Sequence, residues 1–142
     1  VYIDAKEKDL EKLLNGTKRM IIRGASGRKL PHGRVNPGDR LFFIQNNGEG
    51  LVRVAASVTQ VTNTEKLSQE ASVLMIEEKA HELQLTSVQF KRWAGKRYLV
   101  LIGIEKAIEI EPFTIDRSEY GNMDDWLPVG EIDRVRLPPS DD

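Results

Sequence analysis

An alternating stretch over residues 51–61 constrains the fold of this chain most. Apolar side chains recur at every second position of the stretch: Val52, Val54, Ala56 and Val58. This period of two is typical of a half-buried β-strand. The preceding residues 46–50 read NNGEG, a turn sequence, and residues 41–45 before them are a second apolar run. The sequence therefore predicts an antiparallel hairpin over residues 41–61.

Apolar residues spaced by three and four predict helices at two further points of the chain. Leucines over residues 5–15 indicate a first helix, with Asp4 as its capping residue. A second helix is expected between Ser68, its cap, and Leu83. Residues 86–89 read TSVQ, a capping-box pattern that predicts the start of a short third helix.

The longest strand candidate covers residues 97–110, where aromatic and β-branched residues are dense. Gly103 within it indicates a bulge or the close approach of another backbone. We expect Pro112 to end the regular pairing, and a last short strand over residues 132–135.

The order of these elements predicts an α+β fold. Regular crossovers do not separate the strands, which argues against a doubly wound parallel sheet. We expect a mixed, mostly antiparallel sheet that forms a small open barrel with flanking helices. A chain of 142 residues is of the size of one domain, so residues 1–142 are interpreted as a single unit with a frayed tail over 137–142.

The composition argues against several classes of protein. The net charge of −1 gives no bulk attraction to nucleic acid, so any such attraction must come from local patches. The chain has no cysteine and no apolar run of membrane-spanning length, and we expect a cytoplasmic protein without a membrane contact. His32 and His81 lie far apart with no cysteine to assist them, so no metal site is predicted. No cofactor motif is apparent.

The stretch from Thr17 to residue 40 holds a third of the basic charge of the chain. Seven lysines or arginines lie in it beside one acid, Asp39. Its glycines can turn backbone N–H groups toward an anion, and its arginines can fork onto phosphate. Four residues form the expected phosphate contacts of the loop: Ser26, Arg28, Lys29 and Arg34. The alternative is a solvated, mobile loop.

The chain resembles the PUA-like superfamily, and within it ASCH-type domains more than EVE-type ones. Residues 15–23 read NGTKRMIIR, which is similar to the ASCH opening G-x-K-x-x-x-x-R. Residues 35–41 read VNPGDRL, which is similar to the x-x-G-D-x-L element of the second strand. The resemblance covers roughly residues 10–110. It implies a small pseudo-barrel, a cleft near the first strand, and binding of RNA, nucleotides or modified bases.

Some ASCH proteins hydrolyse the acyl group of acetylated cytidine, and the resemblance implies which residues correspond to theirs. The lysine of the opening motif matches Lys18 and the arginine matches Arg23. The glutamate of the helical insert corresponds to Glu82. The threonine position is Ile21, which has no hydroxyl, so the hydrolytic mechanism is not expected to transfer unchanged.

Three aromatic residues are candidates to stack on a base: Trp93, Tyr120 and Trp126. Trp93 lies among lysines and arginines, whereas the segment 120–126 places two acids beside an aromatic ring. Those acids could instead bind magnesium. A third alternative is a turn whose tryptophan is anchored on the core.

The first functional hypothesis is a module that binds RNA or a modified nucleotide through Lys18, Arg23, the basic loop and one aromatic residue. The second is a hydrolase of a small modified nucleoside in which Lys18 and Glu82 transfer protons. The third is a protein-interaction domain whose acidic tail pairs with a basic partner. The sequence leaves the oligomeric state open.

Overall fold

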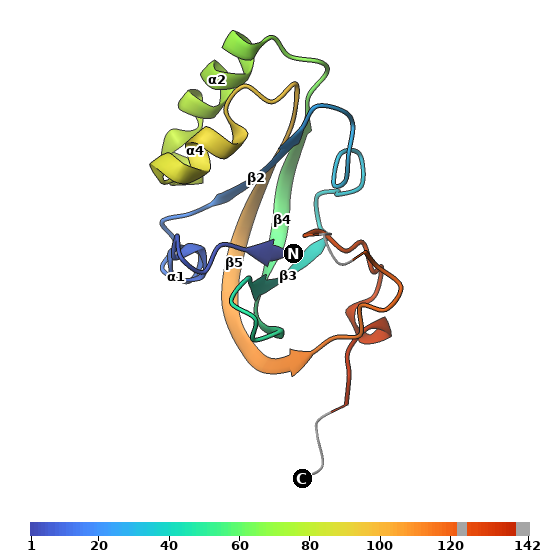
Figure 1. Ribbon diagram of the computed structural model, residues 1–142. Helices are drawn as coiled ribbons and strands as arrows, with labels where there is room; N and C mark the ends of the chain where they lie inside the picture. The colour runs from blue at the N-terminus through green and yellow to red at the C-terminus, as the bar shows by residue number, and fades with distance from the viewer. Residues whose placement is uncertain (122–124, 139–142) are drawn as a thin grey trace.

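The computed structural model describes residues 1–121 and 125–138 of the chain. Its elements follow one another in the order β1 (Tyr2–Ile3), α1 (Asp9–Leu14), β2 (Met20–Ala25), β3 (Arg40–Gln45), β4 (Leu51–Asn63), α2 (Gln69–Glu78), α3 (Ala80–Leu83), α4 (Ser87–Trp93), β5 (Tyr98–Thr114) and the 3-10 helix η1 (Ile132–Arg134). Figure 1 shows α2 and α4 on one side of the sheet and the segment after β5 on the other, with the N-terminus between them.

The strands form one mixed, open sheet in the order β1-β3-β4-β5-β2. β1 runs parallel to β3, and the other three neighbouring pairs are antiparallel. The predicted α+β class, with a mostly antiparallel open sheet and flanking helices, is confirmed. The predicted hairpin is the β3–β4 pair.

Two hydrophobic clusters lie on opposite faces of this sheet. Along β2, Ile21 packs in the larger cluster. Its neighbours Met20 and Ile22 pack in the smaller cluster, against α2, α3 and α4. β5 alternates in the same way: Val100 belongs to the larger cluster, and Leu99 to the smaller one. Because successive side chains of a strand point to opposite faces, a strand between two cores is apolar at every position. This explains the unbroken apolar runs in both strands.

Gly103 marks both a bulge and a close approach, as the sequence predicts. The register between β4 and β5 shifts at Val58 and Gln60, opposite this glycine. A Cβ atom at position 103 would lie 2.7 Å from Thr59 Oγ1 and 2.8 Å from Gln60 Cγ. Only glycine fits here without a shift of its neighbours.

The first helix is shorter than predicted. It begins at Asp9 rather than residue 5, and residues 5–8 form turns that end in Lys8, which has a left-handed backbone with φ of 59°. Asp4 is therefore not its cap. The Asp4 carboxylate accepts hydrogen bonds from Gln89 and Arg92 of α4 instead. A tertiary contact has replaced the local capping contact.

Two predictions about the later strands are wrong. Pro112 does not end the pairing, because Phe113 and Thr114 still pair with β4. The proline falls in a register irregularity, since Val52 pairs with Phe113 but Val54 pairs with Glu109. The expected strand over residues 132–135 is the 3-10 helix η1, and sheet-like pairing appears only as a bridge between Ile115 and Arg136.

The helical segment after β4 is also divided more finely than predicted, into α2 and α3. The predicted caps are confirmed: Ser68 Oγ accepts the N–H of Ala71, and Thr86 and Gln89 form a complete capping box. Of the predicted tail, Leu137 donates its N–H to the Thr114 carbonyl, and residues 139–142 lie outside the described part. Among the helices of the described chain, none is long and apolar enough to cross a membrane.

Candidate nucleotide-binding cleft

A cleft of about 440 Å³ lies where β1, β2 and α4 meet. Four of the residues that line it are cationic: Lys18, Arg23, Arg92 and Arg117. Three carry carboxylates: Asp4, Asp9 and Asp125. Tyr2 and Trp93 supply aromatic surface. The cleft therefore combines donors, acceptors and rings in a volume typical of small-ligand sites.

Lys18 reaches the floor of the cleft because the chain reverses at the end of α1. Gly16, with φ of 81°, makes this turn, and the Lys18 backbone N–H donates to the Lys12 carbonyl. The Lys18 side chain is 4% exposed, and its Nζ donates to the Leu83 carbonyl at 2.6 Å. Burial lowers the pKa of this amine to about 8, against the opposing effect of the Asp9 carboxylate 3.9 Å away.

Arg23 is held in one orientation by contacts on several sides. Its terminal nitrogens donate to the carbonyls of Ile22 and Tyr2, at 2.8 and 2.6 Å. Nε lies 3.2 Å from a carboxylate oxygen of Asp125. The guanidinium carbon is 5.8 Å from the ring centroids of both Trp93 and Trp126, within the range of cation–π attraction. Burial lowers the pKa of Arg23, which as an arginine stays charged.

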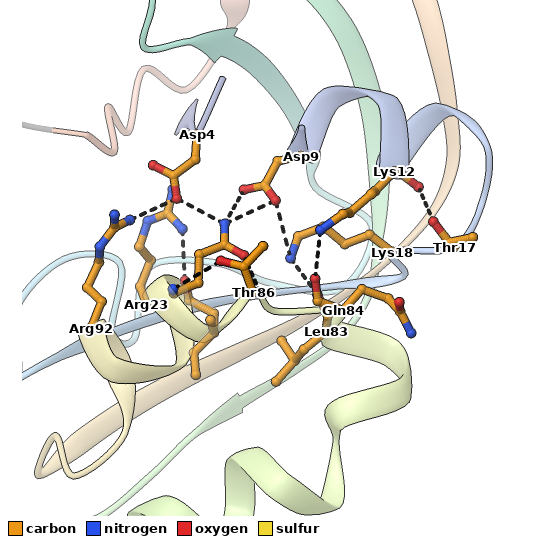
Figure 2. Close-up of polar contacts among 12 residues, drawn as sticks. Asp4, Asp9, Lys12, Thr17, Lys18, Arg23, Leu83, Gln84, Thr86 and Arg92 are labelled. Atoms are coloured by element: carbon orange, nitrogen blue, oxygen red, sulfur yellow. Dashed lines mark hydrogen bonds and ion pairs between the residues drawn. The ribbon is translucent and has the colours of Figure 1, made fainter. Parts of the chain in front are cut away.

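Gln89 joins two carboxylates at one point of the cleft. Its Nε2 donates to Asp4 at 3.0 Å and to both oxygens of Asp9 at 3.0 and 3.1 Å. Its Oε1 accepts the N–H of Thr86 at 3.1 Å, which fixes the orientation of the amide. Figure 2 shows Asp4, Asp9 and Lys18 in a row, with Arg92 beyond Asp4.

Arg92 completes the row at the rim, where its guanidinium contacts Asp4 at 2.8 Å. Burial tends to raise the pKa of Asp4, but the hydrogen bonds from Gln89 and Arg92 outweigh it and hold the pKa below its ordinary value. Asp4 is therefore ionised at neutral pH. The row thus presents fixed acceptors beside the fixed donor of Lys18.

Of the residues predicted from the sequence, the structure brings Lys18, Arg23 and Trp93 together in the cleft. Ser26, Arg28 and Lys29 lie instead in the exposed loop after β2. Within that loop, Arg28 forms an ion pair with Glu65 at 2.7 Å and lies 5.7 Å from the ring centroid of Tyr98.

Other predicted residues also lie outside the cleft. Arg34 and Trp126 line a second cavity, and Trp126 is 5% exposed and packs in the larger hydrophobic cluster. Tyr120 is half-buried and lines neither cavity. Glu82 lies on α3, where its carbonyl accepts the N–H of Arg19. The part of the predicted acidic segment over 122–124 lies outside the described residues.

Asp4, Asp9 and Gln89 are cleft residues that the sequence did not reveal. Asp4 and Gln89 both matched local helix-capping patterns, which gave each of them a sufficient structural role. Gln89 does fill its capping role, but through Oε1 alone, and its Nε2 is left to bind the carboxylates. The signal for a role beyond capping comes from the structure, in which the Gln89 side chain is 2% exposed.

No protein-family model and no curated protein matches the sequence. Solved structures do match the fold. The crystal structure of ASCH from Zymomonas mobilis superposes with a TM-score of 0.60 at 12% identity, covering 80% of this chain and 71% of that one. The chain has the fold of an ASCH domain.

Two single-substitution mutants of the same Zymomonas mobilis protein match equally well. Their TM-scores are 0.60 and 0.58 at 13% and 12% identity, and they are covered over 73% and 72% of their length. The resemblance to PUA-like, ASCH-type domains is therefore confirmed at the level of the fold. At this identity the likeness extends to the fold alone.

Proposed function

We propose that the cleft binds one nucleotide of a single-stranded RNA, with the base inside and the phosphates at the cationic rim. The observation that carries this proposal is the burial of three polar residues of the cleft: Lys18 and Asp9 of the row, and Gln89, which binds it. None of the three is more than 5% exposed. Burying charges in this way opposes folding unless each charge is well paired. A set of this kind that lines an open cavity is more typical of a binding site than of a core.

The chemistry of the cleft matches a nucleotide in three respects. The Asp4 and Asp9 carboxylates are acceptors for base amino or imino groups, and Lys18 Nζ is a donor for a base carbonyl. Trp93 lines the cleft with an aromatic ring, and bases stack on such rings without regard to sequence. Arg92, an exposed cation at the rim, is placed to contact a phosphate.

Single-stranded RNA is favoured over a duplex because the cleft is concave and its polar row is deep. Bases can reach such a row only when they are unpaired and turned out of a stack. The basic loop over residues 26–34 would then contact the backbone outside the cleft, as an exposed electrostatic surface rather than as the recognition site.

The experiment is a salt titration of the binding of a short mixed-sequence RNA. Each phosphate contact adds about 0.7 to the slope of log K against log salt for a single strand. Arg92→Ala should weaken binding and reduce this slope by about 0.7. Arg97→Ala is the matched control, because Arg97 is also exposed and lines neither cavity. Affinity that is indifferent to salt, or equal effects of the two substitutions, would refute the proposal.

A second candidate function is hydrolysis of an acylated nucleoside, and the lowered pKa of Lys18 favours it. An amine with a pKa of about 8 is partly neutral at physiological pH and can act as a general base. Ile21 lines the same cleft and has no hydroxyl, so the base would have to activate water. Release of acetate from acetylated cytidine that is lost in Lys18→Met would support this candidate. Equal release by the variant would exclude Lys18 as the base.

A further inference from the structure

A second cavity of about 440 Å³ lies between β3 and the segment that follows Asp125. Most of the residues that line it are apolar, among them Leu41, Phe42 and Trp126. Three arginines stand around it: Arg34, Arg40 and Arg134. Apolar lining with cations around it suits a ligand that has a ring and an anionic group.

The described lining of this cavity has one acid, Asp39, against the three arginines. Asp39 accepts the N–H of Asn36 through Oδ2 at 2.9 Å. Arg134 has one ion pair, with Glu119 at 3.3 Å, but both side chains are more than 60% exposed, so this pair contributes little. Arg40 lies over the ring of Phe42, with 5.6 Å between guanidinium carbon and ring centroid. The cavity therefore carries a local excess of positive charge beside an aromatic ring.

Two short segments, residues 1–2 and 125–126, form a wall between the two cavities. Tyr2 and Asp125 face the cleft, whereas their neighbours Val1 and Trp126 face the second cavity. The two segments are joined by a hydrogen bond from Tyr2 N–H to the Asp125 carbonyl at 2.9 Å. In Figure 1 the N-terminal strand β1 lies between the helices and the C-terminal segment, as such a wall requires.

We propose that the second cavity takes a neighbouring nucleotide of the same RNA strand whose base occupies the cleft. The phosphate contacts Arg40 and Arg134, and the base packs on Phe42 and the apolar lining. This inference rests on the proposed function of the cleft. It adds that the binding site spans more than one nucleotide and crosses the wall formed by Tyr2 and Asp125.

The test compares the affinities of a nucleoside monophosphate and of RNA oligomers of two, four and six nucleotides. In the unmodified protein, affinity should rise about tenfold or more from the monophosphate to the four-nucleotide oligomer. Arg40→Ala/Arg134→Ala should abolish this rise and leave the affinity for the monophosphate within twofold. Loss of this phosphate contact should also lower the salt slope for the oligomer by about 0.7.

Arg53→Ala is the matched control, because Arg53 lines neither cavity and pairs with Glu49 on the surface. It should keep the full dependence on length. Binding of the monophosphate without any gain from length would overturn the inference and leave the cleft intact. A gain from length that survives the double substitution would also overturn it. Failure of every ligand to bind would refute the proposed function itself.

Discussion

Replacing Gln89 by leucine tests whether the polar row of the cleft is held together by one amide. Leucine has nearly the volume of glutamine, so the change removes hydrogen bonds with little change in packing. Asp9, which is 5% exposed, loses the donor that binds both of its oxygens and, among the described residues, keeps only Lys18 at 3.9 Å. The Thr86 N–H also loses its partner.

The expected loss of unfolding free energy is about 2–4 kcal/mol. A hydrogen bond to a buried charged group contributes about 1.5–3 kcal/mol, and half of a capping box contributes up to about 1 kcal/mol. Asp4 loses less, because Arg92 and Asn46 still donate to it. With a urea m-value of about 2 kcal/mol/M, the midpoint of unfolding should fall by about 1–2 M.

Urea denaturation at pH 7, followed by circular dichroism, measures this shift. Gln69→Leu is the control, because Gln69 is exposed on α2 and should move the midpoint by less than about 0.3 M. Gln89→Glu keeps the acceptor for Thr86 but sets a third carboxylate against Asp4 and Asp9, so it should be destabilised at pH 7 and recover toward pH 5. A midpoint for Gln89→Leu equal to that of the control would refute this account of the row.

Three further predictions concern stability. Gly103→Ala should cost about 1–3 kcal/mol in urea unfolding, because the added Cβ would meet Thr59 Oγ1 at 2.7 Å and Gln60 Cγ at 2.8 Å; an unchanged midpoint would show that β4 yields freely. Thr86→Ala should lose about 1 kcal/mol through its cap, and a loss shared equally by Ser87→Ala, a neighbouring exposed position, would contradict that reason. Because the folded pKa of Lys18 is about 8 against an ordinary 10.5, the unfolded state binds more protons between these values, and stability should rise with pH there by up to about 3 kcal/mol relative to Lys18→Met. Parallel pH dependences of the two proteins would place the lysine in solvent.

The sequence predicted most of the sheet, because strand patterning is local and strong. Alternation over residues 51–61 located β4, and the dense aromatic and β-branched residues around Gly103 located β5. The helix caps at Ser68 and Thr86 were predicted for the same reason, since each is a contact within four residues.

What the sequence could not predict are contacts across long separations. Asp4 has a good local partner in sequence, yet its carboxylate binds side chains 85 and 88 residues away. Pro112 ends a strand by local rules, but a register irregularity between β4 and β5 accommodates it. Lys18 and Arg23 were predicted because residues 15–23 resemble a local motif. The carboxylates opposite them were not predicted, because only distant contacts bring them to the cleft.

The most direct test of the central claim is a nuclear magnetic resonance titration of the labelled protein with nucleoside monophosphates. The side-chain amide of Gln89 and the indole N–H of Trp93 report on the cleft, and the backbone amides of Arg28 and Lys29 report on the exposed loop. The account predicts saturable shifts of the Gln89 and Trp93 signals with small changes in the loop. Shifts confined to the loop, with Gln89 and Trp93 unmoved, would contradict it.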